Sequence, residues 1–341
     1  MAAGHSLANP ARGTEGEIEI EAIMTDAITI REAILDDATP ISALFRARIP
    51  TWQRLTAKGG VDNVPYENLT VYERWTHGGP WMSIETASLA LARLLHGVGL
   101  ALVAEQNGQV VGYLEAYPGY ETAPFGAHLH LAHLATSSEG AVAESIADAL
   151  LKRAAEVARH MPDRRLTISL PSETGDDAIF FRQRGFKALA KVGRYLVPAK
   201  AGQGFYQVTE HAASNVSQIE GFQMPLGRTE SASMLWESVW VSIWEVIPQL
   251  AARKIQRVKL NASGQEILLC VQPVPHDPRV MDLWGWAARP MTGVVLTALR
   301  DWALREKYRA LRMVVDTETA ALFGSDAEAD PFSRTTLALT V

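Results

Sequence analysis

An order of predicted elements that occurs twice is the feature that most constrains the fold of this chain. In residues 101–197 two β-rich runs flank Asn107-Gly108, and a strand, a long helix rich in Ala and Leu, and a further strand follow. A weaker copy of this order occupies residues 258–341, with Ser263-Gly264 between its apolar runs. An Asn-Gly pair between β-rich runs predicts a hairpin, because both residues accept a positive φ at low cost. The repetition predicts two similar halves.

Composition sets the size of the protein and excludes some classes. A chain of 341 residues suggests about two domains of roughly 150 residues each. The formal net charge is −6 and the sequence has no long basic run, which argues against a dedicated nucleic-acid surface. The single cysteine, Cys270, excludes an internal disulfide and a cysteine cluster for a metal. Because Cys270 lies in the apolar run 267–271, we expect a buried, inert thiol.

The apolar stretches and the first residues bear on the location of the protein. The sequence has no run of about 20 apolar residues, because Arg93 and His96 interrupt the best candidate at 87–103. The chain does not start with a basic segment followed by an apolar one, so we expect no secretory signal. Residues 1–27 mix Gly, Ala and Glu without periodicity and are expected to form a flexible tail. We therefore expect a cytoplasmic protein with no membrane partner.

The first half of the chain is expected to alternate strands and helices. Apolar residues at helical spacing predict one helix over 83–96 and another over 142–160. The segment 45–85 is rich in Gly, Pro and aromatic residues, and its pattern does not assign it to helix, strand or loop. The remaining predicted elements are strands at 28–31, 100–105, 109–116, 129–135, 166–170 and 194–197, and a short helix at 176–184.

A glycine-rich segment at 202–204 is the predicted boundary between two domains. It divides the chain into the tail, a domain of residues 28–200 and a domain of residues 201–341. The predicted elements near the end of the second domain are strands at 283–287, 311–315 and 334–341, and a helix at 292–307.

A helix rich in tryptophan is also predicted in the second domain, over 231–250. Trp236, Trp240 and Trp244 are spaced four residues apart, so a single helix would place them on one stripe. Such a stripe is typical of a packed core rather than of a ligand site. We expect this helix to pack against its own sheet or against the first domain.

Four motifs of the first half occur in an order that resembles one known family. They are the run 103–112 with its Asn-Gly turn, Leu134-Ala135-Thr136 at a strand end, Ala149-Leu150-Leu151 in a helix, and Phe180-Phe181 ahead of Gly185-Phe186. The set resembles the core of the Gcn5-related N-acetyltransferases and extends over residues 28–200, about half the chain. The resemblance implies an α/β protein with a mixed (α+β) sheet, made of two tandem acyl-CoA N-acyltransferase-like domains, the second degenerate. It also implies acetyl-CoA as the cofactor.

The resemblance places the pyrophosphate of coenzyme A at a loop that leads into a helix. Exposed amides at a helix N-terminus attract anions, and the helix dipole adds to this attraction. Counted back from Ala149-Leu150-Leu151, only the last of the six positions matches the family motif outright, and Glu144 adds a negative charge. The resemblance implies that amides near Leu134, Ala135 and Thr136 polarise the acetyl carbonyl. The six loop positions are Val142, Ala143, Glu144, Ser145, Ile146 and Ala147.

Acetyl transfer to an amine needs a neutral nucleophile, a polarised carbonyl and a tolerable leaving group. The resemblance implies His133 as the base, and histidine titrates near neutrality; Glu115 on the preceding strand is the second choice. A hydrogen-bonded structural histidine is the alternative interpretation. The tyrosine with which the family usually protonates the leaving thiolate corresponds to Phe181, which has no proton to give. We therefore expect a slow enzyme, another donor such as Tyr195, or an inactive descendant.

Three histidines on one predicted strand raise the question of a metal. Strand alternation places His128 and His130 on one face, and His133 on the other unless a bulge intervenes. The sequence offers no further cysteine and no helical His-Glu-x-x-His motif to complete a tetrahedral set. We therefore predict no metal site.

The predicted function is acetyl transfer from acetyl-CoA to a primary amine of a small molecule or a peptide. A non-catalytic acyl-CoA-binding or regulatory protein is the first alternative, and a purely structural duplication is the second. The aromatic segment 52–81 is expected to line the acceptor pocket, since acceptor specificity usually lies in such loops. No nucleic-acid partner is expected, and a homodimer is left open.

Overall fold

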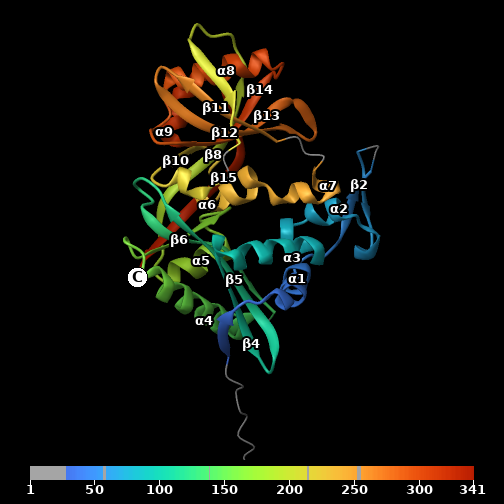
Figure 1. The fold of residues 1–341 in the computed structure, drawn as a ribbon. Coiled ribbons are helices and arrows are strands. Elements are labelled where there is room, and N and C mark those ends of the chain that lie inside the picture. Colours follow the sequence, from blue (N-terminus) through green and yellow to red (C-terminus); the bar gives the residue numbers. More distant parts are fainter. Residues whose placement is uncertain (1–27, 57–58, 138, 213–214, 252–254) are drawn as a thin grey trace, which may run out of the picture.

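The computed structural model describes residues 28–341 except for 57–58, 138, 213–214 and 252–254. The flexible tail predicted for residues 1–27 therefore lies outside the described residues. The described chain forms a large mixed sheet with helices packed against it (Figure 1), which confirms the predicted α/β class.

The first half of the chain follows the predicted order of elements. Asn107 and Gly108 have positive φ angles of 53° and 74° and form the predicted hairpin turn. The side chain of Ser83 caps the helix predicted at 83–96 by accepting a hydrogen bond from the amide of Thr86 (3.3 Å). The elements are β1 (Thr29–Glu32), α1 (Ala38–Arg46), β2 (Gln53–Leu55), β3 (Val61–Asn63), α2 (Val71–Trp75), α3 (Ile84–Arg93), β4 (Leu100–Gln106), β5 (Gln109–Tyr120), β6 (Ala127–Thr136), α4 (Gly140–Ala158), β7 (Arg165–Leu170), α5 (Asp176–Gln183) and β8 (Lys187–Pro198).

The second half repeats the order of hairpin, strand, helix and parallel strand, as predicted. Ser263 and Gly264 form its hairpin turn with positive φ angles of 52° and 75°. The side chain of Thr292 caps the following helix by accepting a hydrogen bond from the amide of Val295 (3.4 Å). The elements are β9 (Tyr206–Glu210), β10 (Gln223–Leu226), α6 (Ala232–Leu235), α7 (Pro248–Ala251), β11 (Gln256–Ala262), β12 (Gln265–Val274), β13 (Asp277–Ala287), α8 (Gly293–Arg305), β14 (Ala310–Asp316), α9 (Thr317–Ala320) and β15 (Glu328–Thr340).

One sheet runs through both halves in the order β1-β4-β5-β6-β7-β15-β8-β14-β13-β12-β11-β9, and β10 pairs with β13. The pairs β6–β7 and β13–β14 are parallel, and the other pairs are antiparallel. The last strand, β15, returns from the second half and lies between β7 and β8 of the first. The sheet therefore continues across the predicted boundary at residue 200, and the division into two domains stays a prediction.

Helices cover both faces of the sheet in the first half. On one face α4 packs buried residues such as Ile146 against Leu114 of β5 and Leu131 of β6. On the other face α1 and α3 pack over a cluster that contains Trp81 and Tyr113. Strand β6 therefore presents its side chains to two different environments.

The single tryptophan-rich helix predicted over 231–250 is wrong. Helix α6 continues into a π-helical segment, Trp236–Val241, which ends at Ser242 in the left-handed region (φ 47°). Trp236 and Trp240 stack on each other at 4.6 Å over their own sheet. Trp244 turns away and meets Trp75 of α2 at 4.5 Å. The break at Ser242 thus places one tryptophan of the stripe against the first half.

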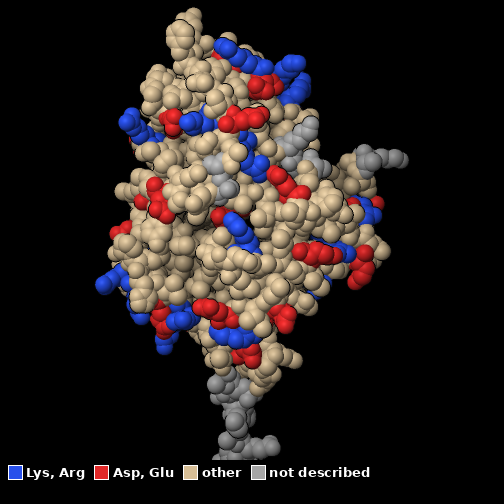
Figure 2. All heavy atoms as spheres, in the orientation of Figure 1, with Lys and Arg blue, Asp and Glu red and all other residues tan. Residues whose placement is uncertain are grey.

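The surface carries charges of both signs. On the face shown in Figure 2, acidic and basic side chains are interspersed over both halves. Within the described residues, no helix combines the length and the apolar character needed to cross a membrane.

Candidate active site

Strands β6 and β7 separate at one end and leave a cleft between them. They pair only between His128–Leu131 and Arg165–Ile168. Beyond these residues lies a cavity of about 810 Å³, bounded by the end of β6, the start of α4, the end of β7 and α5. Among the residues that the structure describes, no strand pairs with β6 beyond Leu131 on the β7 side, so this edge of β6 borders the cleft.

The start of α4 borders this cleft, two residues earlier than predicted. The helix begins at Gly140, so residues 142–147 lie inside it rather than in a loop, which corrects the prediction. The amides of residues 139–142 have no partner within the helix, and Glu139 at the N-cap makes no capping side-chain hydrogen bond. Gly140 has a φ of +65°, and a Cβ there would meet no atom within 4 Å. Open space therefore lies beside this turn.

The structure brings only part of the predicted set to the cleft. The residues at the cleft are His133, Leu134, Thr136, Ala143, Glu144, Ala147 and Phe181. Ala135 and Ile146 are fully buried in the apolar clusters on opposite faces of the sheet. Val142 and Ser145 are exposed and do not line the cleft.

Tyr195, the alternative proton donor, lies elsewhere. Its ring packs against Phe323 at 5.6 Å, beside the core of the second half. It lines neither this cleft nor the cavity that contains Glu115. The structure therefore does not bring Tyr195 to His133. The separation of Tyr195 from the cleft could not be predicted from the sequence, because the last strand, β15, is inserted between β7 and β8.

A bulge in β6 decides where His133 points. Glu115 pairs with His133 across β5 and β6, but the next residue, Ala116, pairs with Leu131, so Ala132 is an extra residue. The bulge returns His133 to the face that holds His130, the condition under which the sequence allowed all three histidines on one face. The ring of His133 meets that of Phe45 edge-on at 5.3 Å.

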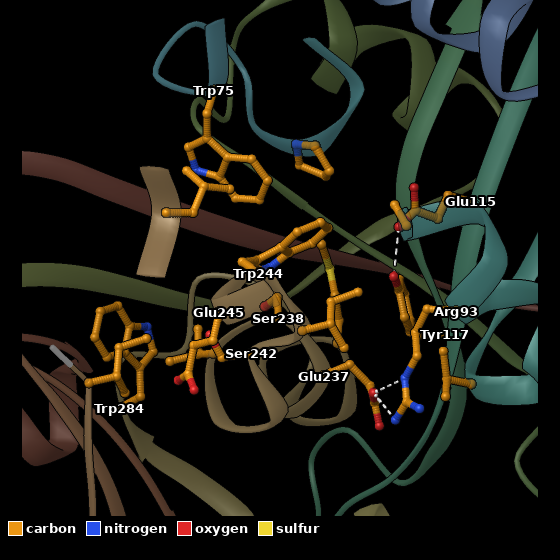
Figure 3. Close-up of a pocket in the computed structure, with 18 of the residues that line it drawn as sticks. Trp75, Arg93, Glu115, Tyr117, Glu237, Ser238, Ser242, Trp244, Glu245 and Trp284 are labelled. Atoms are coloured by element: carbon orange, nitrogen blue, oxygen red, sulfur yellow. Dashed lines mark hydrogen bonds and ion pairs between the residues drawn. The ribbon is translucent and has the colours of Figure 1, made fainter. Parts of the chain in front are cut away.

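A second cavity, of about 270 Å³, lies on this face between the two halves (Figure 3). Its walls come from α2, α3 and β5 of the first half and from residues 234–250, Ile255, β12 and β13 of the second. Trp75 and Pro80 of the aromatic segment 52–81 reach it. An ion pair between Arg93 and Glu237 (2.8 Å) joins the two halves at its wall. We call it the interdomain cavity because it lies between the two halves that the sequence predicts as domains. His133 lines both this cavity and the β6–β7 cleft.

Glu115 is buried in the wall of the interdomain cavity, with 4 % of its surface exposed. Its carboxylate accepts hydrogen bonds from the Trp81 indole (2.9 Å) and from the hydroxyls of Tyr117 (2.8 Å) and Tyr113 (3.3 Å). Burial, followed by the charge of Glu115, raises the pKa of both tyrosines well above 10, so both remain donors at neutral pH. Glu115 is therefore held in place rather than free to swing toward a substrate.

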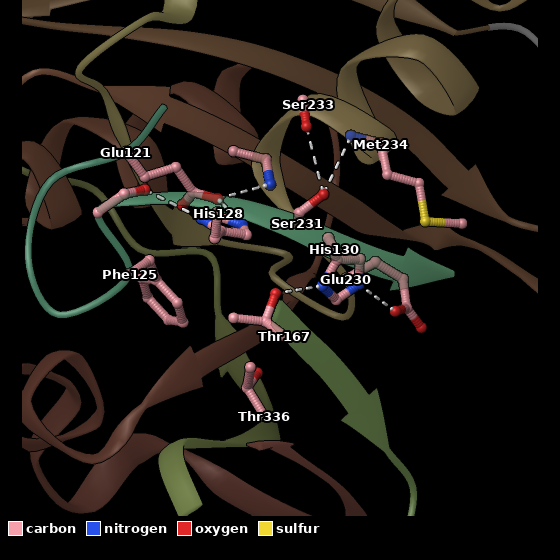
Figure 4. A network of polar contacts seen from close by, with 12 residues as sticks. Glu121, Phe125, His128, His130, Thr167, Glu230, Ser231, Ser233, Met234 and Thr336 are labelled. Atoms are coloured by element: carbon pink, nitrogen blue, oxygen red, sulfur yellow. Dashed lines mark hydrogen bonds and ion pairs between the residues drawn. The ribbon is translucent and has the colours of Figure 1, made fainter. Parts of the chain in front are cut away.

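Polar residues beside His133 form a buried network between the halves (Figure 4). His130 contacts Thr167 and the Glu230 carboxylate, both at 2.9 Å, and Glu121 forms an ion pair with Arg228. Burial lowers the pKa of His130 to about 3 and raises that of Glu230 to about 7. The hydrogen bond between His130 and Glu230 therefore joins a neutral imidazole to a carboxyl group and involves little separation of charge.

His128 belongs to the same network. Burial lowers its pKa to about 4, and its Nε2 lies 3.6 Å from the Glu121 carboxylate. Among the described residues, no three His, Cys, Asp or Glu side chains are grouped to hold a metal ion. His128 and His130 therefore act as neutral, packed groups.

Charged residues from distant parts of the chain line the β6–β7 cleft, and the sequence analysis missed them. Arg48 donates to the carbonyl of Leu134 (3.4 Å), and Arg334 arrives on the inserted strand β15. Four acidic residues also line the cleft. No local motif marks either arginine, because their positions depend on the packing of α1 and on the strand order. The acidic residues are Glu139, Glu144, Asp176 and Asp177.

The corresponding place in the second half is closed. Strands β13 and β14 pair only between Val280–Asp282 and Ala310–Arg312. Beyond these residues β10 pairs with β13, and the amide of Gly227 donates to the carbonyl of Val314 on β14 (2.7 Å). A Cβ on Gly227 would come within 2.6 Å of the Leu283 carbonyl oxygen. The chain itself fills this second cleft tightly.

Comparison with solved structures shows the fold of the Gcn5-related N-acetyltransferases, as the resemblance predicted. A Gcn5-related N-acetyltransferase from Anabaena variabilis matches with a TM-score of 0.55 at 8 % identity, over 92 % of this chain and 73 % of that one. One from Kribbella flavida matches with a TM-score of 0.53 at 11 % identity, over 92 % and 71 %. At these identities the likeness concerns the fold alone. No family model and no curated protein sequence matches this chain.

Proposed function

We propose that the protein is an N-acetyltransferase that binds acetyl-CoA in the β6–β7 cleft and its acceptor amine in the interdomain cavity. The observation that carries the proposal is the position of His133, which lines both cavities. A base that reaches both spaces can meet a nucleophile from one side and an acyl group from the other.

The residues of the cleft fit coenzyme A in most respects. The free amides at the start of α4 and the open space at Gly140 suit the pyrophosphate, because helix N-termini attract anions. Arg48 and Arg334 supply positive charge. The four acidic side chains at the cleft oppose the phosphates, although Glu144 is offset by Arg184 at 3.4 Å. We therefore expect binding of moderate affinity.

Acetyl-CoA supplies an acetyl thioester, whose carbonyl carbon is the electrophile. The edge of β6 beyond Leu131, which pairs with no described strand on the β7 side, offers peptide amides that can donate to a carbonyl oxygen in the cleft. His133 would accept the proton that the acceptor nitrogen loses on attack. Phe181 is buried in the apolar cluster and supplies no proton to the departing sulfur. Because a thiol has a pKa of about 8.5, its thiolate is still a tolerable leaving group.

Phe181 also supports a second candidate function, a non-catalytic acyl-CoA sensor. Its ring packs edge-on against that of Phe186 at 5.2 Å, so the side chain at position 181 is part of the hydrophobic core. A sensor would bind acetyl-CoA without turnover. A purely structural duplication would bind neither acetyl-CoA nor an amine.

Thermal unfolding with and without acetyl-CoA tests the cleft. At 100 times Kd, binding should stabilise the native state by about 2.7 kcal/mol, which raises Tm by several degrees. Ala143→Trp should abolish the shift, because Ala143 lines the cleft, whereas Lys152→Trp on the exposed side of the same helix should keep it. Release of free thiol in the presence of amines then separates an enzyme from a sensor. No shift at millimolar acetyl-CoA would refute the proposed site.

A further inference from the structure

The interdomain cavity has two chemically different ends (Figure 3). Trp75 and Trp244 lie on one side, and Glu115 with Tyr117 lies on the other. His133 belongs to the polar end, since it is the cross-strand neighbour of Glu115. A ligand that fills this cavity must therefore combine an apolar body with a polar head group directed at His133.

The apolar end is built from aromatic rings of both halves. Trp75 and Trp244 meet at a ring separation of 4.5 Å and an angle of 63°. Trp244 reaches this position because the chain turns at Ser242, and Ile243 beside it also lines the cavity. Two rings set at an angle form a corner, which offers edge and face contacts to a flat apolar group.

The polar end carries a carboxylate that no cation offsets. Arg93 pairs with Glu237 (2.8 Å), and Arg257 pairs with Glu245 (2.8 Å), so these acids of the cavity wall are neutralised. Among the described residues, Glu115 forms no ion pair, and its three hydrogen-bond donors are neutral groups. A buried carboxylate in this state attracts a cationic head group.

The size of the cavity limits the ligand to a small molecule. Its volume is about 270 Å³. An apolar cavity of about 150 Å³ already holds a benzene molecule. One aromatic ring with a short aminoalkyl chain therefore fits, and a folded peptide chain does not.

We propose that the acceptor is a small primary amine with a flat, apolar body. Its ring lies against Trp75 and Trp244, and its ammonium group faces Glu115 until one proton passes to solvent. His133 accepts the second proton when the neutral nitrogen attacks, and the C–S bond of the thioester breaks to release the thiolate of coenzyme A. The nitrogen attacks from the side of the interdomain cavity. This inference rests on the proposed function, because the acetyl donor must occupy the cleft on the other side of His133.

Calorimetric titration of the full chain without acetyl donor tests the ligand class directly. We expect 2-phenylethylamine to bind at least tenfold more tightly than 1,4-diaminobutane, which lacks the ring. It should also bind at least tenfold more tightly than 2-phenylethanol, which lacks the charge. Equal affinity for 2-phenylethylamine and the diamine, or for 2-phenylethylamine and the alcohol, would overturn the inference.

Variants of the cavity locate the binding site. Trp244→Ala should weaken 2-phenylethylamine at least tenfold, whereas Val246→Ala, at an exposed position outside the cavity, should not change its affinity. Ser238→Trp fills the cavity without removing packing and should abolish binding. A retained thermal shift with acetyl-CoA shows that each variant is folded. Unchanged affinity in Ser238→Trp would overturn the assignment of this cavity.

Turnover separates a failure of this inference from a failure of the proposed function. If thiol is released from acetyl-CoA with 1,4-diaminobutane or a tetrapeptide but not with 2-phenylethylamine, the enzyme is established and the ligand class is wrong. If acetyl-CoA causes no thermal shift and no amine releases thiol, the proposed function fails, and the proposed acceptor role fails with it. Faster release with 2-phenylethylamine than with the other two supports both.

Discussion

The β6–β7 cleft and the corresponding place between β13 and β14 differ in what fills them. Both pairs of strands run parallel for a few residues and then stop pairing. In the first half the space stays open, beside a helix start with no capping side chain. In the second half β10 occupies the space, and Thr292 caps the following helix. The same order of elements thus yields a possible ligand site in one half and a packed core in the other.

The difference also shows what the closed half contributes. After β10 fills the second cleft, the chain continues into the segment that supplies Glu230, Glu237 and Trp244 to the first half. The pairing of β10 with β13 and the hydrogen bond from Gly227 to Val314 fix the N-terminal end of this segment. The second half therefore supplies part of the wall of the cavity between the halves, and its last strand, β15, adds Arg334 to the open cleft.

The largest expected effect concerns the junction of the two cavities. His133→Ala should lower kcat by about 10²–10⁴-fold, the usual contribution of a positioned acid or base. The affinity for acetyl-CoA should change only a few-fold, because His133 contributes little of the cleft surface. Steady-state kinetics and calorimetry measure the two quantities. His211→Ala, a histidine of the second half outside both cavities, is the control. A wild-type rate in His133→Ala would remove His133 from the mechanism.

The next effect concerns the strand that closes the second cleft. Leu226 on β10 is fully buried, so Leu226→Ala should cost about 3 kcal/mol of the free energy of unfolding. Urea unfolding measures this loss, and Val294→Ala, half-exposed on α8, should stay within about 0.5 kcal/mol of the wild type. A loss below about 1 kcal/mol in Leu226→Ala would show that β10 is not a packed closure.

A smaller effect concerns the buried histidines of the network between the two halves. The pKa of His128 is about 4 when folded, below the ordinary value of 6.5, so the unfolded chain binds the extra proton between these values. The stability contributed by neutral His128 is therefore present above pH 6.5 and is lost as the pH falls toward 4. From pH 7 to pH 5 the loss is about 2 kcal/mol.

The matched variant isolates this contribution of His128. Glu230 acts in the opposite sense below pH 7, since its pKa is raised to about 7, but its effect is common to the wild type and His128→Gln. Urea unfolding at both pH values should therefore show a smaller acid loss in His128→Gln by about 2 kcal/mol. An equal loss in both proteins would contradict a neutral, buried His128.

The smallest effect concerns the acidic lining of the open cleft. Glu139 stands at the start of α4, where its charge opposes a bound phosphate. Glu139→Gln should tighten acetyl-CoA binding by about two- to fivefold, and high salt should reduce the difference. Glu156→Gln, on the same helix and paired with Arg153, should have no effect. Weaker binding in Glu139→Gln would mean that this carboxylate holds the ligand or its loop.

The sequence predicted the features that local chemistry determines. The two hairpin turns, the repeated order of elements and the fold follow from short-range patterns, and so does the position of His133 on β6. The start of α4 was misplaced by two residues, which moved the predicted phosphate loop into the helix. The continuous tryptophan helix was wrong because Ser242 adopts a left-handed conformation that only tertiary packing selects.

Long-range contacts decided the rest of the candidate site. The insertion of β15 beside β7 brings Arg334 to the cleft and separates Tyr195 from it, and no local pattern encodes this strand order. The bulge at Ala132 turns His133 toward the interdomain cavity. The sequence does not reveal this bulge, because the alternation of residues along β6 does not show where one extra residue is inserted. The closure by β10 depends on the close approach at Gly227.

The number of acetyl-CoA molecules bound by each chain tests the contrast between the two clefts most directly. Isothermal titration calorimetry of the full chain with acetyl-CoA measures it. An open first cleft and a closed second one predict one molecule per chain. Two molecules per chain would show that β10 does not close the second cleft, and no binding would show that the open cleft is not a site for acetyl-CoA.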